Sequence, residues 1–578
     1  MTRQIGTDLL RLLQVLAWDS LSAFGLLVSA PDQPHDESDP ALSRTTLFHG
    51  ATVYTGEAAS PTAEAFAVQD GRFLAVGTQE EVRAAVGPDA AEEDLHGAFV
   101  LPGFWESHVH MTMLGEALDK VSLRECANLD EIQQRIAEAR TADSQATQIL
   151  GASWYPHAFA PGQQPTAAML DAVVADIPVI LDANSLHAAW VNTAGLAALG
   201  ITRDTPDPLG GQIVRDADGE PTGLLLENAA IEYAWGHQAA HSTEADQDRF
   251  LDNAFRSYLA SGTTGATDMG FSDSDLAVFR RRLERDGRLP FPVDAHWLLR
   301  PTGDPGADLA EVERVAAIRD EIAAEFGTQW LRIVGVKLIL DGVIDACTAA
   351  MRAPYVGGEL PDPLWEREAA LRVATAADAH GLQLALHAIG DQASTLALDL
   401  VEECVHVNGA REERRPRVEH LESVAQDTIE RMAQLGVTAS MQPVHCDPAV
   451  LDNWRAMLGD DRAVQGFPWH RFREAGVPIA LGTDAPTAPH QAARNLFIAL
   501  TARSAFDAGR DPYQPERVFA PADALEALTS AGARASGRDG TGRIAAGLAA
   551  DFCVLDRNPL TDDPDELLKL KVQRTVTG

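Results

Sequence analysis

Lys337 is the residue whose setting first suggests chemistry. It lies in the apolar run 334–340, a pattern typical of a buried strand. The chain has 42 arginines and only four lysines, so a primary amine stands where a cation is hard to bury. A buried ammonium must be paired, neutralised or chemically changed, and lysine shifts its pKa on burial more readily than arginine. Taken alone, Lys337 fits either a salt-bridged strand residue or a functional group.

A His-x-His pair ends another apolar run. His108 and His110 follow the segment Leu101-Pro102-Gly103-Phe104-Trp105-Glu106-Ser107. On a strand, residues i and i+2 point to the same face, so both imidazoles can reach one metal ion. The pair alone is a weak signal.

Three further candidates lie at the ends of expected strands: His387, His420 and Asp484. A lone strand-end histidine is more often a satisfied core residue than a ligand. Here 33 residues separate His387 from His420, about one βα unit, and 64 separate His420 from Asp484, about two. The joint spacing therefore indicates a site shared by the ends of several strands.

The middle of the chain alternates apolar runs with helical stretches, which predicts βα units. The expected strands are 98–102, 263–268, 291–296, 333–340, 382–387, 417–419, 437–441 and 477–482. Eight such strands predict an α/β fold, a TIM (β/α)8 barrel over 101–535, with catalytic residues at the C-terminal strand ends. The region is longer than a plain barrel, which takes about 250 residues. The extra length predicts an insertion after strand 1, at about residues 115–260.

Both ends of the chain outside this region look β-rich. Residues 44–100 include a hairpin that turns at Asp70-Gly71. Residues 536–578 show a similar pattern of short, strand-like runs. Neither segment alone buries a core, so we expect them to pair into one small β-sandwich. Residues 1–43 read as an N-terminal extension and acidic linker, too polar for a membrane span and weak as a signal peptide.

Composition limits the partners. The chain is 46% hydrophobic and 23% charged, as soluble globular proteins are. A net charge of −39 argues against nucleic acid and anionic membranes as partners. The five cysteines include no C-x-x-C pair, which argues against a disulfide framework or a cysteine-based zinc site and favours the cytoplasm.

The strand-end residues and the Leu101-Pro102-Gly103-Phe104 segment resemble the amidohydrolase superfamily of metal-dependent hydrolases. Other stretches resemble its amidohydrolase-3 branch, which includes the YtcJ-like proteins and N-substituted formamide deformylase. These stretches are residues 336–342, 348–350 with 354–355, 387–391, 210–213 with 219–223, and 547–551. The resemblance covers about residues 45–570.

The resemblance implies two metal ions held by six residues: His108, His110 and Asp484 on the first, His387 and His420 on the second, and Lys337 bridging both. Lys337 would be carboxylated by CO₂, which turns a buried cation into an anionic ligand. Zinc is the expected metal, with manganese or iron as alternatives. Asp484 would also accept the proton of the attacking water and pass it to the leaving amine.

The implied activity is hydrolysis of a non-peptide C–N bond, an amide or formamide of a small molecule, by a metal-activated hydroxide. Three alternatives stay open: a cyclic amide or imide hydrolase, a mononuclear variant with unmodified Lys337, and a catalytically silent regulatory member. A homodimer is also left open.

Some positions depart from the family pattern or bear on the substrate. Glu106 stands where many relatives have aspartate, and residues 345–347 replace a short Ser/Arg segment. His187 and Gln442 are candidate substrate contacts, and His445 is a similar candidate. The family pattern places no metal ligand on strand 7, which precedes His445.

Overall fold

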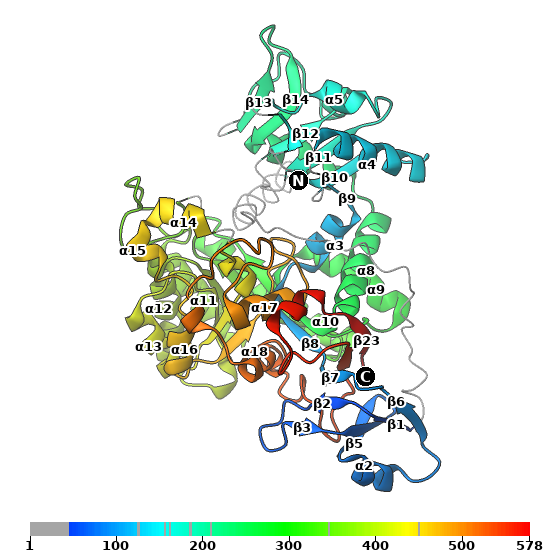
Figure 1. Cartoon of the computed structure of the whole chain (residues 1–578). Helices are drawn as coiled ribbons and strands as arrows, with labels where there is room; N and C mark the ends of the chain where they lie inside the picture. Colours follow the sequence, from blue (N-terminus) through cyan, green and yellow to red (C-terminus); the bar gives the residue numbers. More distant parts are fainter. Residues whose placement is uncertain are drawn as a thin grey trace. The chain divides into compact units, whose positions relative to one another are not determined.

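The computed structural model describes residues 45–123, 126, 128–154, 158–160, 163–183, 188–208, 211–344, 347–448 and 451–578. These residues belong to two compact units. One unit consists mainly of Thr112–Asn253. The other contains the described residues up to Met111, together with Ala254–Pro486 and His490–Gly578. Figure 1 labels the elements of both.

An eight-stranded parallel sheet, of which Figure 1 labels β8, forms the centre of the larger unit. Its strands, in spatial order, are β21 (Ile479–Leu481), β20 (Thr438–Met441), β19 (Arg417–His420), β18 (Gln383–Ala388), β17 (Leu331–Ile339), β16 (Val293–Leu299), β15 (Thr263–Phe271) and β8 (Phe104–Val109). The two edges meet just beyond β8 and β21, where Asp484 N donates to His108 O over 2.7 Å and His110 N donates to Ala485 O over 3.0 Å. The sheet is therefore a nearly closed barrel, which confirms the α/β TIM-like prediction.

The barrel strands are buried along most of their length, as expected for parallel strands covered by helices on one side and a packed interior on the other. The helices of this unit are α9 (Asp273–Asp286), α10 (Pro305–Phe326), α11 (Arg367–Ala379), α12 (Asp391–Asn408), α13 (Gln426–Leu435), α14 (Leu451–Leu458), α15 (Asp460–Ala463), α16 (Trp469–Glu474), α17 (Ala492–Thr501), α18 (Pro521–Ala527) and α19 (Ser530–Ala535). None of the described helices is long and apolar enough to cross a bilayer.

One expected barrel strand, 98–102, was wrongly placed. Those residues form β7 (Phe99–Pro102), which pairs with β22 (Phe552–Leu555) in a different sheet. The chain changes sheets at Gly103, whose position leaves no room for a side chain: a Cβ there would lie 2.1 Å from Thr264 Oγ1 on β15. The first barrel strand is β8, and the other seven expected strands lie within a few residues of the observed ones.

Two small sheets lie outside the barrel. The four-stranded sheet has the order β5 (Arg72–Gly77), β4 (Ala65–Gln69), β1 (Thr46–His49), β6 (Ala91–Asp94). The five-stranded sheet has the order β23 (Val572–Val576), β22, β7, β2 (Thr52–Tyr54), β3 (Thr62–Ala63), so it joins strands from both parts of the chain. The sheets share a hydrophobic core in which the rings of Phe66 and Phe552 lie 5.0 Å apart.

The hairpin predicted at Asp70-Gly71 is confirmed. β4 and β5 pair antiparallel, and both turn residues have positive φ, 50° and 71°. Asp and Gly adopt this conformation at low cost, as a tight two-residue hairpin turn requires. Helix α2 (Gln79–Val86) follows β5 and begins with a capping box between Thr78 and Glu81.

The unit formed by Thr112–Asn253 has its own six-stranded sheet and core. The sheet order is β13 (Gly211–Arg215), β14 (Pro221–Glu227), β12 (Ala188–Val191), β11 (Val179–Ala183), β10 (Ile149–Trp154), β9 (Val121–Ser122). Trp154, Leu181 and Trp190 belong to its hydrophobic core. The helices in this stretch and at its ends are α3 (Met111–Asp119), α4 (Leu129–Ala142), α5 (Ala167–Asp171), α6 (Thr193–Ala198), the π-helix η3 (Ala230–Trp235), α7 (Gly236–His241) and α8 (Glu244–Ala260).

Candidate metal centre

Three predicted ligands converge where the barrel closes. His108 lies at the end of β8, His110 just beyond it, and Asp484 just beyond β21. The Nε2 atoms of His108 and His110 each lie 3.3 Å from Asp484 Oδ1, and all three side chains are buried. Asp484 has a φ of 59°, unusual for a non-glycine residue, and its backbone is held there by the bond to His108 O.

Lys337 reaches the same place from β17. Its Nζ lies 3.3 Å from His108 Nε2, and the side chain is buried. Strand register sets this position, because Lys337 lies opposite Leu298 on β16 and Ala385 on β18. The amine singled out in the sequence is thus next to His108, one of the predicted ligands.

A second group lies on the neighbouring strand ends. His387 near the end of β18 and His420 at the end of β19 have ring centroids 4.4 Å apart. His420 also forms a group with His445 and Asp484, in which one ligand atom from each lies within 4.8 Å of the others. His445 Nε2 is 3.8 Å from Asp484 Oδ2. Asp484 therefore faces histidines on both sides through different oxygens.

Four of the five imidazoles have Nδ1 engaged by a side-chain oxygen. The pairs are His108 with Glu419 Oε2 at 2.8 Å, His387 with Asp341 Oδ1 at 3.1 Å, His420 with Gln442 Oε1 at 3.0 Å and His445 with Glu422 Oε1 at 3.3 Å. A carboxylate or carbonyl oxygen only accepts, so Nδ1 carries the proton and Nε2 keeps its lone pair. This is the arrangement by which partners of metal-bound histidines fix the ring and its tautomer.

His110 is the exception. Its Nδ1 has no hydrogen-bond partner among the described residues, and its ring lies against Gly270. A Cβ at position 270 would lie 2.5 Å from His110 Nδ1, so only glycine leaves room for this ring.

A buried charge pair supports His108. Arg417 Nε donates to Glu419 Oε1 over 2.6 Å, and the Arg417 guanidinium also donates to Ser107 O and Ser440 Oγ, each over 2.7 Å. Burial alone would raise the pKa of Glu419, but the charge of Arg417 and the hydrogen bond from His108 hold that pKa well below its usual range. Glu419 is therefore an ionised acceptor for His108 Nδ1.

Glu106 ties the first barrel strand to the last. Its Oε1 accepts from the backbone N–H groups of His108 and Thr483, and its Oε2 accepts from the Thr483 hydroxyl over 2.7 Å. Burial raises the pKa of Glu106 to about 7, against the effect of these hydrogen bonds. Glu106 thus fixes the backbone on either side of the site.

The electrostatics keep the ligands in their binding forms. Burial lowers the pKa of His108 to about 3, and the charge of the Lys337 amine adds to the effect. Burial likewise holds the pKa of His420 well below its ordinary value. Burial would raise the pKa of Asp484, but the neighbouring histidines hold it below its usual range. Neutral imidazoles and an ionised carboxylate are the donors that a divalent metal such as zinc takes, so this donor set fits such an ion.

Other predicted positions lie as follows. Gln442 is buried against His420, and its Nε2 has no hydrogen-bond partner among the described residues, so its role as a substrate contact stays a prediction. His187 and residues 345 and 346 fall outside the described residues. Four supporting groups were not predicted from the sequence: Arg417, Glu419, Asp341 and Glu422. The i, i+2 spacing of Arg417 and Glu419 on a buried strand was the available signal.

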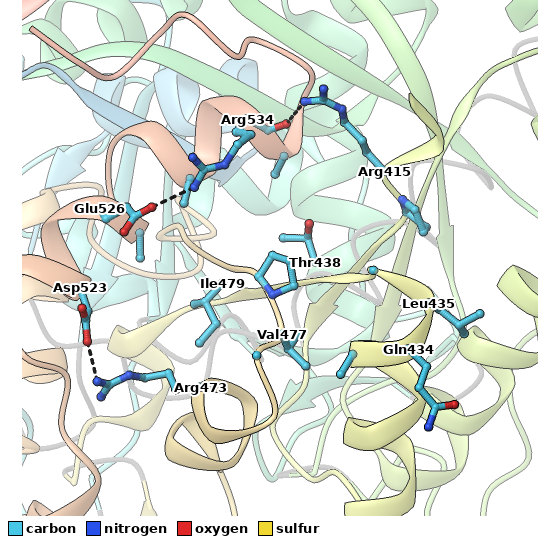
Figure 2. A pocket seen from close by; sticks show the side chains of 18 of the residues that line it. Arg415, Gln434, Leu435, Thr438, Arg473, Val477, Ile479, Asp523, Glu526 and Arg534 are labelled. Carbon is cyan, nitrogen blue, oxygen red and sulfur yellow. Dashed lines mark hydrogen bonds and ion pairs between the residues drawn. The ribbon is translucent and has the colours of Figure 1, made fainter. Parts of the chain in front are cut away.

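A cavity of about 1280 Å³ lies at the opposite, N-terminal ends of β19, β20 and β21 (Figure 2). Its arginines are paired with carboxylates: Arg415 with Asp539, Arg473 with Asp523 and Arg534 with Glu526. None of the predicted metal ligands lines it. These three arginines already have carboxylate partners.

Comparison with known proteins assigns the chain to a family. Residues 91–578 match the model of the amidohydrolase family, and the chain belongs to that family. It is a hydrolase acting on carbon–nitrogen bonds other than peptide bonds.

Individual relatives and structures cover most of the chain. This chain is 30% identical to YtcJ of Bacillus subtilis (strain 168), an amidohydrolase by name. The match covers 92% of this chain and 98% of that protein. It is also 30% identical to N-substituted formamide deformylase of Arthrobacter pascens, over 92% and 97%. A metal-dependent hydrolase from Pyrococcus furiosus, uncharacterised in function, superposes with a TM-score of 0.71 at 26% identity, covering 89% of this chain and all of that one.

Proposed function

We propose that this chain hydrolyses an amide or formamide bond of a small molecule at the centre formed by the barrel's C-terminal strand ends. The observation that carries the proposal is the convergence of His108 Nε2 and His110 Nε2 on Asp484 Oδ1, with Lys337 Nζ beside them. The formamide deformylase among the relatives supports this substrate class.

In this proposal six residues hold two divalent ions: His108, His110 and Asp484 the first, His387 and His420 the second, and Lys337 both. Zinc fits the donors best, and manganese or iron are alternatives. Ions bound here would polarise the substrate carbonyl and lower the pKa of water. Lys337 takes part as a carbamate: its neutral amine bonds to the carbon of CO₂ and loses one proton, which leaves an anionic group with two oxygens.

Asp484 moves the proton in the reaction. Its Oδ1 faces His108 and His110, whereas its Oδ2 faces His445, on the side of the second group. Asp484 accepts the proton of the attacking water and delivers it to the nitrogen that leaves, because that nitrogen departs only as a protonated amine.

The same proposal extends to the organisation of the chain. We assign residues 44–100 and 536–578 to one composite β-sandwich and 101–535 to the catalytic barrel with its insertion. Residues 1–43, the predicted N-terminal extension and linker, lie outside the described residues. The shared core of the two small sheets supports the first assignment. We place the enzyme in the cytoplasm.

A substrate screen tests the function. Purified, metal-loaded protein is assayed against N-formyl amines, N-acyl amines and cyclic amides or imides. We expect turnover of the N-formyl or N-acyl compounds, loss of activity on treatment with a chelator, and recovery on addition of zinc. Turnover of cyclic substrates alone would favour the alternative activity, and turnover that survives complete metal removal would contradict the proposal.

A further inference from the structure

His445 occupies a position that the family pattern leaves without a ligand. It lies in the 3-10 turn η5 (Pro443–Cys446) directly after β20. Its Nε2 lies 3.8 Å from Asp484 Oδ2, and one atom each of His420, His445 and Asp484 lie within 4.8 Å of one another. A metal ion could contact all three at once.

Glu422 orients His445 as the partners of the other ligands orient theirs. Its Oε1 lies 3.3 Å from His445 Nδ1, and its side chain is 10% exposed. Glu419 and Asp341 engage Nδ1 of His108 and His387 in the same way. The carboxylate therefore fixes the tautomer in which His445 Nε2 has the lone pair.

The backbone of the turn is fixed as well. Val444 N donates to Asn495 Oδ1 over 2.9 Å, and Asn495 Nδ2 donates to Gly482 O over 2.6 Å. Asn495, on α17, therefore joins the turn that carries His445 to the strand end that precedes Asp484. The rings of His445 and His420 are nearly parallel, with centroids 6.0 Å apart.

The facing atoms suit a cation. With Nδ1 donating to Glu422, His445 Nε2 is an acceptor, and Asp484 Oδ2 lies 3.8 Å from it. A metal ion between the two atoms would take a lone pair from each, whereas a proton on Nε2 would make the two groups an ion pair. Metal binding distinguishes the two.

We propose that His445 is a ligand, with His420, of the second metal ion, beside Asp484 Oδ2, and that Glu422 is its positioning residue. This rests on the two-metal centre of the proposed function. It assigns a fifth histidine to the centre and makes the end of β20 part of it.

Metal binding tests this assignment without an activity assay. Metal-free wild type, His445→Ala and Glu422→Gln are titrated with Co²⁺ and Zn²⁺, with visible absorption of Co²⁺ and chelator competition as readouts. His490→Ala is the matched control, because His490 is a buried histidine whose Nε2 bonds to Ser257 Oγ at 2.7 Å. Glu422→Gln keeps the size of the side chain and provides a second test if His445→Ala fails to fold.

We expect His445→Ala to weaken the second ion by at least tenfold and to change its Co²⁺ spectrum, with the first ion and His490→Ala unchanged. Glu422→Gln should weaken the same ion by roughly tenfold, the lower end of the usual effect of a ligand's hydrogen-bond partner. Unchanged affinity and spectrum in both variants would overturn the assignment, even if KM rose. Failure of the wild type to bind any ion would instead overturn the two-metal centre itself.

Discussion

Strands β19, β20 and β21 present charged groups at both ends, and the two ends differ in how those charges are arranged. At the C-terminal ends, histidine nitrogens converge on the carboxylate of Asp484. At the N-terminal ends, arginines of the cavity are paired with carboxylates (Figure 2), and the side chains of Arg534 and Glu526 are each about half exposed. Pairs of opposite charge satisfy each other in water, whereas converging acceptors need a cation. The arrangement of charge, not its amount, separates a reactive site from a solvated surface.

Loss of the proton-transfer group should give the largest effect. We expect Asp484→Asn to lower kcat/KM by about 10² to 10⁴, the usual contribution of general acid–base catalysis. The measurement is steady-state hydrolysis, with circular dichroism to confirm the fold. Asp523→Asn in the cavity is the control and should leave kcat/KM near that of the wild type. Near-normal turnover in Asp484→Asn would remove its catalytic role.

Lys337→Ala should empty much of the metal centre. The variant removes the group that the proposal places between the two ions, so we expect elemental analysis to find much less metal than in wild type. Arg473→Ala, at the other end of the strands, should keep the full complement. A full metal complement in Lys337→Ala would refute the carboxylate bridge.

Glu419→Gln should weaken both metal binding and the fold. The change removes the ionised acceptor of His108 Nδ1, so we expect the affinity for the first ion to fall about 10- to 100-fold. It also leaves Arg417 buried without its ionic partner, which typically costs about 3–5 kcal/mol of the free energy of unfolding. Chelator competition and urea unfolding measure the two effects. No change in either would show that the buried pair does not support the centre.

The metal-free protein should lose stability as pH falls from about 6.5, the ordinary pKa of an unfolded histidine. Burial lowers the pKa of His108 and His296 to about 3 and that of His490 to about 4. Between these values the unfolded chain binds protons that the folded chain does not, so the free energy of unfolding rises with pH across this window. Urea unfolding at pH 8 and pH 5 measures the difference; equal stability would contradict it.

Arg534→Ala should have the smallest effect. Both Arg534 and Glu526 are about half exposed, and such pairs contribute less than about 1 kcal/mol to stability. We expect unchanged metal content and turnover, with the midpoint of urea unfolding as the sensitive readout. A large loss of metal or activity would mean that the two ends of the strands are coupled.

The barrel strands and the candidate metal ligands could be predicted from the sequence because both depend on local patterns. A strand end followed by histidine or aspartate is visible in the chain, as at His387, His420 and Asp484. Residues 98–102 were assigned to the wrong sheet, since periodicity does not reveal that their partner is the distant strand β22. The partners of the histidines were missed for a similar reason: Glu422 and Asp341 follow strands without a distinctive spacing, and only the fold brings them to Nδ1.

Reconstitution of metal-free enzyme tests the central claim most directly. Zn²⁺ is added stepwise to the wild-type protein while bound metal and hydrolysis of an N-formyl or N-acyl amine are followed together. The account predicts no turnover without metal and a rise that saturates near two ions per chain. Turnover by the metal-free protein would contradict the account.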